Sequence, residues 1–205
     1  MNKWKFVPYV VFHPIEGFYE MRYKKGESFG ISILLYLLFV FSLIAQQKYC
    51  GLQFAFTDDA QVSIQRTLAS TLGLMVAAVF SNWGFCVLLE GKARLKEIWI
   101  LINYALIPHT AFSFLYVILS NMATREEGML LGVLMWIGTG WSAFLLLRAL
   151  MAYHEFTFSG AIGSVVLTVV GVAIILFLLL LLVSLFQKVF STFSVIFNEI
   201  LFRFR

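Results

Sequence analysis

The stretch SGAIGSVVLTVVGVAIILFLLLLLVSLF, residues 159–186, contains no charged side chain and decides the fold class. A helix needs about 20 apolar residues to cross roughly 30 Å of hydrocarbon, because it rises about 1.5 Å per residue. This stretch exceeds that length, whereas a surface helix of a soluble protein keeps a polar face. The sequence therefore predicts that residues 159–186 cross a membrane.

Four further long apolar stretches precede this one, at residues 29–45, 67–89, 98–119 and 129–147. The chain is 61% hydrophobic and only 13% charged, which is far from the composition of a soluble domain. Helices are the expected form, because unpaired backbone groups in lipid are costly and a helix pairs them within one segment. We predict an all-α polytopic membrane protein with five transmembrane helices.

The flanking segments differ in character from the spans, which divides the chain into three parts. Residues 1–28 form a cytosolic or interfacial segment, residues 29–186 the transmembrane domain, and residues 187–205 an amphipathic C-terminal helix. In the tail, large apolar residues recur at helical spacing and predict an interfacial anchor, with binding to a partner protein as the alternative. The anchor consists of Phe186, Phe190, Phe193, Phe197 and Phe204.

A short amphipathic helix is predicted before the first span. Pro14 suits the first helical position, Glu16 suits the first turn, and Gly26 is well placed to end the helix. We expect its apolar face, which consists of Ile15, Phe18 and Tyr19, to rest on the bilayer.

Basic residues predict the orientation, because Lys and Arg accumulate in cytoplasmic loops. Five spans place nine basic residues on the side of the N-terminus and six on the opposite side. The first group is Lys3, Lys5, Arg22, Lys24, Lys25, Lys92, Arg94, Lys96 and Arg148, and the second is Lys48, Arg66, Arg125, Lys188, Arg203 and Arg205. We predict a cytoplasmic N-terminus. The three basic residues after the last span leave four or six crossings as alternatives.

Small residues in the second span indicate how the helices pack. Ala69, Gly73, Ala77 and Ser81 stand four residues apart on one helical face. Such a stripe allows close approach of another helix, because van der Waals packing drives helix association in lipid. We expect the second span to be central, and packing within the molecule is favoured over homodimerisation.

Polar residues at bilayer depth are costly and mark candidate functional positions. The notable ones are Asn82, Asn103 and His109, with Pro108 expected to break or kink the third span. They could form an intramembrane polar site of a small transporter or channel. The alternative, which we favour, is that each makes an interhelical hydrogen bond worth about 1 kcal/mol.

Motifs for catalysis, metal binding or phosphate binding were not found in the sequence. His13, His109 and His154 lie far apart without ligand-like spacing, and no phosphate-binding glycine loop or nucleophile elbow occurs. The net charge of +4 follows from the loop asymmetry and indicates no nucleic-acid partner. We expect a protein without catalytic residues, metal or cofactor.

Several motifs together resemble the bacterial branch of the Yip1 domain family. They are the basic turn from Glu90 to Glu97, the pattern Tyr-x-Leu-x-Pro at residues 104–108, His-Pro-x-Glu-x-Phe at residues 13–18, and Tyr153-His154 before the last span. The likeness covers most of the chain. It implies a five-helix membrane fold with a cytosolic N-terminus, in the plasma membrane of a bacterium.

The resemblance also bears on function. Eukaryotic relatives are associated with Rab GTPases through a longer N-terminal region with an Asp-Leu-x-Gly-Pro-like motif, which this chain lacks. Bacterial relatives tend to be encoded near ABC transporters. By analogy, the sequence predicts a scaffold or accessory subunit whose partners are the lipid bilayer and another membrane protein, with ABC transporter permease subunits as candidates. A role in shaping bilayer curvature is a third hypothesis, based on the phenylalanine-rich tail.

Overall fold

The computed structural model describes residues 3–24, 26–51, 64–88 and 90–203, which are helical apart from short connections. The elements are η1 (Lys3–Lys5), α1 (Phe6–Phe12), α2 (Pro14–Tyr23), α3 (Phe29–Tyr49), α4 (Ile64–Leu88), α5 (Leu95–Ala105), α6 (Ile107–Ser120), η2 (Arg125–Glu127), α7 (Gly128–His154) and α8 (Phe158–Arg203). Five candidate spans, namely α3, α4, α5 with α6, α7 and α8, are long and apolar enough to cross a membrane. The predicted all-α polytopic fold is therefore confirmed.

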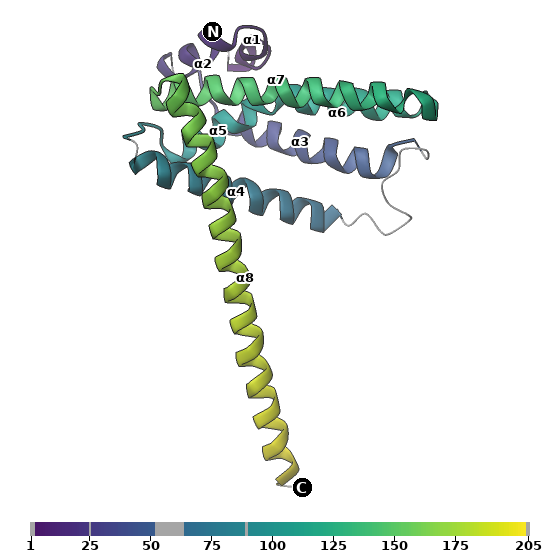
Figure 1. Ribbon diagram of the computed structural model, residues 1–205, viewed down its shortest axis with the longest axis vertical. Helices are drawn as coiled ribbons and strands as arrows, with labels where there is room; N and C mark the ends of the chain where they lie inside the picture. The colour runs from purple at the N-terminus through teal and green to yellow at the C-terminus, as the bar shows by residue number, and fades with distance from the viewer. Residues whose placement is uncertain (1–2, 25, 52–63, 89, 204–205) are drawn as a thin grey trace.

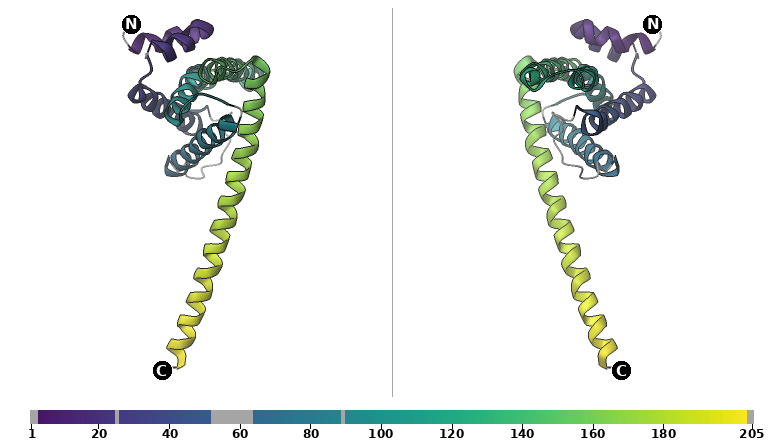
Figure 2. Two further views of the ribbon diagram at one scale, coloured as in Figure 1. Left: turned by 90° about the vertical axis from the view of Figure 1, so that its left-hand side faces the viewer. Right: turned by 90° about the vertical axis from the view of Figure 1, so that its right-hand side faces the viewer.

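Four of the five spans lie side by side, and α8 runs across them. Figures 1 and 2 show α3, α4, α6 and α7 as neighbours, while α8 crosses α4 and projects well beyond the other helices. The main packing pairs are α6 with α7, α3 with α6, and α4 with α8. The ends of α4 and α7 and the start of α8 consequently meet at one end of the bundle.

The third span is divided into α5 and α6 at Leu106, two residues before Pro108. Proline has no backbone N–H and its ring clashes with the preceding turn, so it disfavours an unbroken helix. The break predicted beside His109 is present.

The core lies where α1 and α2 cover α5 and the last turns of α7. Phe6 and Val10 of α1 and Phe18 and Met21 of α2 are fully buried there. α2 begins at Pro14, as predicted, and the Gly26 N–H donates to the Met21 carbonyl beyond its end. The expectation that Phe18 faces the bilayer is wrong, because α2 packs on α7 with that side chain underneath. Its neighbours Ile15 and Tyr19 are exposed.

The second span is not the centre of the molecule. The largest fully buried side chains include Ile98, Leu101 and Tyr104 of α5 and Leu145 and Tyr153 of α7. α4 instead lies at one edge, between α8 and the pair α3 and α5. The core therefore forms around the divided span and α7.

α8 is one helix of 46 residues. The boundary predicted at residue 186 coincides with no break in it. After Gly171 neither glycine nor proline occurs in the helix, and Leu, Ile, Phe and Val continue its apolar surface. Every side chain from Leu176 to Ser194 is exposed. The second half of α8 therefore packs against nothing in the described part of this chain.

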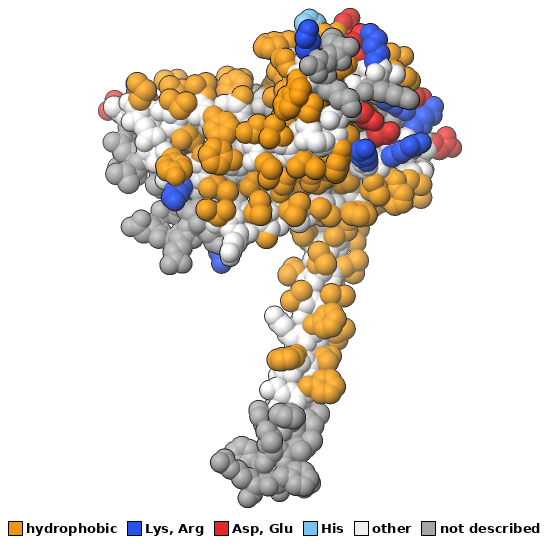
Figure 3. All heavy atoms as spheres, turned by 180° about the vertical axis from the view of Figure 1, so that it is seen from behind, with side chains coloured by type: hydrophobic (Ala, Val, Ile, Leu, Met, Phe, Trp, Pro, Cys, Tyr) orange, Lys and Arg blue, Asp and Glu red, His pale blue; other side chains and the backbone are white. Residues whose placement is uncertain are grey.

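Charged side chains gather at one end of the bundle. Figure 3 shows blue and red atoms concentrated where the N-terminal helices lie, whereas the long sides are covered by hydrophobic atoms. The charged residues at this end include Arg22, Lys24, Lys92 and Glu155. This division is that of a multi-pass membrane protein, with a polar end at the headgroups and apolar flanks in lipid.

Candidate functional site

A buried polar cluster joins α4, α7 and α8 at the charged end of the bundle. Asn82 of α4 donates through Nδ2 to Thr168 Oγ1 (2.9 Å) and Ser164 Oγ (3.3 Å) of α8. Its Oδ1 lies 3.2 Å from Nε2 of His154, the last residue of α7. Because the amide oxygen can only accept, the imidazole carries its proton on Nε2. One amide thus connects three helices.

Close backbone approach accompanies this cluster. Ser81 donates to the Thr168 carbonyl (2.8 Å), and its hydroxyl occupies the place where a Cβ on Gly171 would lie. Cys86 contacts Ser164 Oγ through its sulfur at 3.5 Å. The small residues of α8 and α4 therefore lock the two helices in one register, as small residues do in membrane bundles.

The second nitrogen of His154 faces the turn after α4. Its Nδ1 is buried and has no hydrogen-bond partner in the described part of the chain. A Cβ on Gly91 would collide with this nitrogen and would lie 2.8 Å from the Cys86 carbonyl oxygen. The imidazole also stacks on the Phe156 ring at 5.0 Å. Gly91 is required here because the turn passes directly against the ring.

An ion cluster at the surface joins the end of α7 to α2 and to the turn after α4. Glu155, at φ 60° directly after α7, pairs with Lys92 from the turn after α4 and with Arg22 of α2 at 3.3 Å. Tyr23 donates to the same carboxylate at 2.9 Å, and Arg22 also donates to the Ala152 carbonyl at 2.5 Å. A left-handed backbone is unusual for glutamate, and these contacts keep it in place.

Two carboxyl groups at this end have shifted pKa values in opposite directions. Hydrogen bonds from Lys92 and Tyr23 lower the pKa of Glu155. Burial, followed by the charge of Glu97, raises the pKa of Glu27, although the Tyr153 hydroxyl donates to it at 3.4 Å. The two pKa values shift in opposite directions because hydrogen bonds dominate at Glu155, whereas burial outweighs the Tyr153 hydrogen bond at Glu27.

The structure does not bring the three predicted polar residues into one site. Asn82 belongs to the cluster described above. Asn103 donates only to the Trp99 carbonyl of its own helix (2.8 Å), and its buried Oδ1 has no described partner. His109 lies between α6 and α7, where its Nδ1 is 3.2 Å from Thr139 Oγ1 and its backbone N–H donates to Ser142. Each residue thus has a separate set of partners.

The predicted packing stripe is divided into a packed half and an open half. Ala77 and Ser81 are buried, whereas Ala69 and Gly73 are exposed, and nothing lies within 4 Å of a Cβ built on Gly73. The predicted anchor lies on α8, with Phe186, Phe190 and Phe193 exposed. The side chains of Phe197 and Phe204 lie outside the described residues.

The buried polar cluster and the ion cluster together form a junction between α2, α4, α7 and α8. The sequence analysis did not predict that His154, Glu155 and Gly91 belong to it. Their one signal was that Tyr153-His154 and the basic turn from Glu90 both belong to the motifs that resemble a known family. Chemically, the junction can position helices, because its hydrogen bonds and ion pairs join segments that are distant in the sequence. Among the described residues, no group of three His, Cys, Asp or Glu is placed to hold a metal ion.

Comparison with known proteins identifies the family to which this chain belongs. The Yip1 domain model matches residues 9–182, from within α1 to just past the middle of α8. No curated protein and no solved structure matches the chain. The match includes every residue of the junction and ends before the phenylalanine-rich tail. Because it covers most of the sequence, this chain belongs to the Yip1 domain family.

Proposed function

We propose that this protein is a non-catalytic scaffold or accessory subunit, which packs against another complex in the cytoplasmic membrane of a bacterium. The observation that carries the proposal is the unpartnered second half of α8. The described residues there, Leu176 to Ser194, are all exposed, and the helix projects away from the bundle (Figure 1). An apolar helix of this length offers a continuous surface to a neighbouring transmembrane helix.

The position of the family match supports a partner specific to this chain. The matched residues end at 182, so much of the projecting half of α8 lies beyond the family domain. By analogy with bacterial relatives, permease subunits of an ABC transporter are the partner class to test first.

The orientation is proposed from the charge distribution. Lys5, Arg22, Lys24, Lys92 and Lys96 belong to the segments at the charged end of the bundle, and this excess of basic residues favours the cytoplasm. The N-terminus and the turn between α4 and α5 then lie inside. The turn between α6 and α7 lies outside.

The transporter alternative receives less support. It needs Asn82, Asn103 and His109 to share a polar path, but each of them bonds to different neighbours. Asn82 instead connects α4 to α8 through hydrogen bonds, which is a structural role.

Site-specific photocrosslinking in native membranes tests the proposal. A photoreactive residue replaces Leu180 on the projecting half of α8, and a second variant carries it at Ile118 of α6, which is similarly exposed. We expect a single membrane protein, identified by mass spectrometry, to crosslink from position 180 and not from position 118. Recovery of the uncrosslinked chain alone from both positions, in mild detergent and in membranes, would refute the scaffold role.

A further inference from the structure

A line of large apolar residues runs along the end of α8. Successive members are four and three residues apart, which places them on one helical face. This face, the phenylalanine seam, consists of Phe186, Phe190, Phe193, Phe197, Ile200 and Phe204. The side chains of the first three are between 66% and 78% exposed. Alternating steps of four and three residues are the spacing of the core positions in a coiled coil.

The opposite side of the same segment is polar. Lys188, Ser191 and Thr192 lie there and are exposed. Lys188 is about 160° from Phe186 around the helix, because each residue advances the helix by roughly 100°. A polar face with a lysine belongs in water or at the headgroups and not in the hydrocarbon interior. Two copies that met along the seam would keep both lysines on the outside, so like charges would not oppose the contact.

The seam begins where the membrane crossing ends. Residues 159–186 extend about 42 Å, which exceeds the hydrocarbon thickness of about 30 Å even at a tilt of about 40°. α8 continues without a break to Arg203, so the seam follows the direction of the crossing. A helix that lies along the headgroups would have to turn out of that direction at a kink. The seam therefore leads away from the bilayer, and its phenylalanines need a protein cover.

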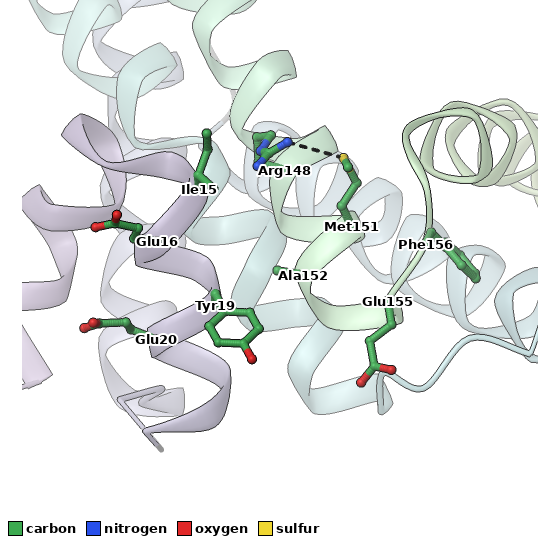
Figure 4. A pocket seen from close by; sticks show the side chains of 9 residues that line it. All are labelled: Ile15, Glu16, Tyr19, Glu20, Arg148, Met151, Ala152, Glu155 and Phe156. Atoms are coloured by element: carbon green, nitrogen blue, oxygen red, sulfur yellow. Dashed lines mark hydrogen bonds between the residues drawn. The ribbon is translucent and has the colours of Figure 1, made fainter.

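The charged end of the bundle offers no comparable contact surface. A groove of about 510 Å³ lies there between α2 and the last turns of α7 (Figure 4). Ion pairs neutralise Glu20 and Glu155, and Glu16 points away from the groove. Arg148 is then the one charge in the groove without a carboxylate partner among the described residues. This groove has no charge pattern that would select a partner.

The uniform orientation of a membrane protein favours a second copy of this chain as the cover of the seam. All copies insert in the same orientation, so their α8 helices leave the same side of the membrane in parallel. A two-fold axis along the membrane normal then brings identical seam residues opposite each other at the same height. Phenylalanine rings that meet in this way can adopt the offset or edge-to-face contacts that aromatic pairs prefer.

We propose that two copies of this chain pair through the phenylalanine seam as a parallel coiled coil outside the membrane. The full length of the seam is needed for its area, because a specific interface buries about 1,200 Å² or more in total and each phenylalanine carries about 150–250 Å². Leu180, the position proposed to face another membrane protein, lies about 120° from Phe186 around the helix. The two contacts use different faces of α8, so either proposal can fail without the other.

Disulfide crosslinking in native membranes tests the pairing. Phe190→Cys in the seam and Lys188→Cys on the opposite side are compared in a background without Cys50 and Cys86. Both positions are exposed on the projecting half of α8, so random collisions between copies should affect them alike. We expect an oxidant to link two chains at position 190 at least about tenfold more than at position 188, because a disulfide requires Cα atoms within about 7 Å.

Light scattering of the detergent-purified full chain is the second measurement, and the wild type should have the mass of two chains. Phe190→Glu with Phe193→Glu should raise the dissociation constant about a hundredfold or more, because each copy would bury unpaired charges. Ser191→Glu with Thr192→Glu adds the same two carboxylates on the opposite side and should leave the dimer intact.

Far-UV circular dichroism of each variant shows that the helices are retained. A wild type with the mass of one chain, a dimer that survives the two seam substitutions, or equal crosslinking at positions 190 and 188 would overturn the proposal.

Discussion

Asn82 and Asn103 are both buried asparagines, yet they differ in what they hold together. Asn82 bonds to His154, Ser164 and Thr168 on two other helices, whereas Asn103 bonds only to its own helix. Asn82→Leu should therefore lower the free energy of unfolding by about 1–2 kcal/mol, since interhelical hydrogen bonds in membranes have this size. Asn103→Leu keeps similar volume and removes a buried oxygen without a partner, so it should be neutral or stabilising.

Thermal unfolding in detergent, followed by circular dichroism, compares the two variants. Equal losses of stability would contradict the assignment of Asn82 as the connecting residue.

Gly91 lies at a position where no side chain would fit. Gly91→Ala places a methyl group against His154 Nδ1 and the Cys86 carbonyl, and overpacking of this kind costs about 1–3 kcal/mol. Gly84→Ala on α4 is the matched change, because nothing lies within 4 Å of its Cβ and alanine favours the helix. We expect a lower melting temperature for the first variant and an unchanged or higher one for the second. The reverse order would show that the turn is not pressed against the imidazole.

The lowered pKa of Glu155 predicts a loss of stability in acid. The group is ionised above its unfolded pKa, near 4.5, so its ion pairs are complete at neutral pH. As the pH falls below 4.5 and through the lower folded pKa, protonation removes this contribution. Glu155→Gln should lose stability at pH 7 and show a flatter pH dependence below 4.5. Melting temperatures measured from pH 7 to pH 3 check this, and parallel curves for the two proteins would exclude the carboxylate as a source of acid sensitivity.

At the scale of elements, the buried part of α7 and the projecting half of α8 should differ in energetic importance. Leu180 on the projecting half of α8 is exposed, whereas Leu145 of α7 is fully buried. Leu145→Ala should cost about 2–5 kcal/mol through the cavity it leaves, and Leu180→Ala should cost about 0.5 kcal/mol or less in the isolated protein. Unfolding in detergent measures both. A large cost at Leu180 in the pure protein would mean that copies of this chain cover the helix, and not a different partner.

Apolar length alone was sufficient to predict the five spans. The predicted stretches at residues 29–45, 98–119 and 129–147 lie inside α3, the pair α5 and α6, and α7. Pro108 also located the division of the third span, because the missing N–H acts locally. Features that depend on neighbouring residues in the chain were thus accessible from the sequence.

Features that depend on distant residues were not accessible. α1 was missed because it is short and contains Pro8, and its stability comes from Phe6 and Val10 packing into the core. The burial of Phe18 was missed because periodicity identifies an apolar face but not whether lipid or α7 covers it. His154 was missed because its partner Asn82 is 72 residues away.

At the scale of the whole molecule, the junction and the projecting helix have complementary consequences. Asn82 bonds α8 to α4 at the charged end, Glu155 and Gly91 hold the end of α7 that leads into α8, and the rest of α8 extends outward from there (Figure 2). A scaffold needs both features, since a rigid attachment determines where the exposed surface is presented.

In the proposed topology, opposite ends of the bundle lie on opposite sides of a membrane, and the scaffold role depends on this arrangement. Substituted-cysteine labelling in a background without Cys50 and Cys86 tests this topology, with single cysteines at Lys96 in the first turn of α5 and at Glu126 before α7, both exposed. A membrane-impermeant reagent added to intact cells should label position 126 at once and position 96 only after the membrane is permeabilised. Labelling of both positions in intact cells, or of position 96 alone, would contradict the topology.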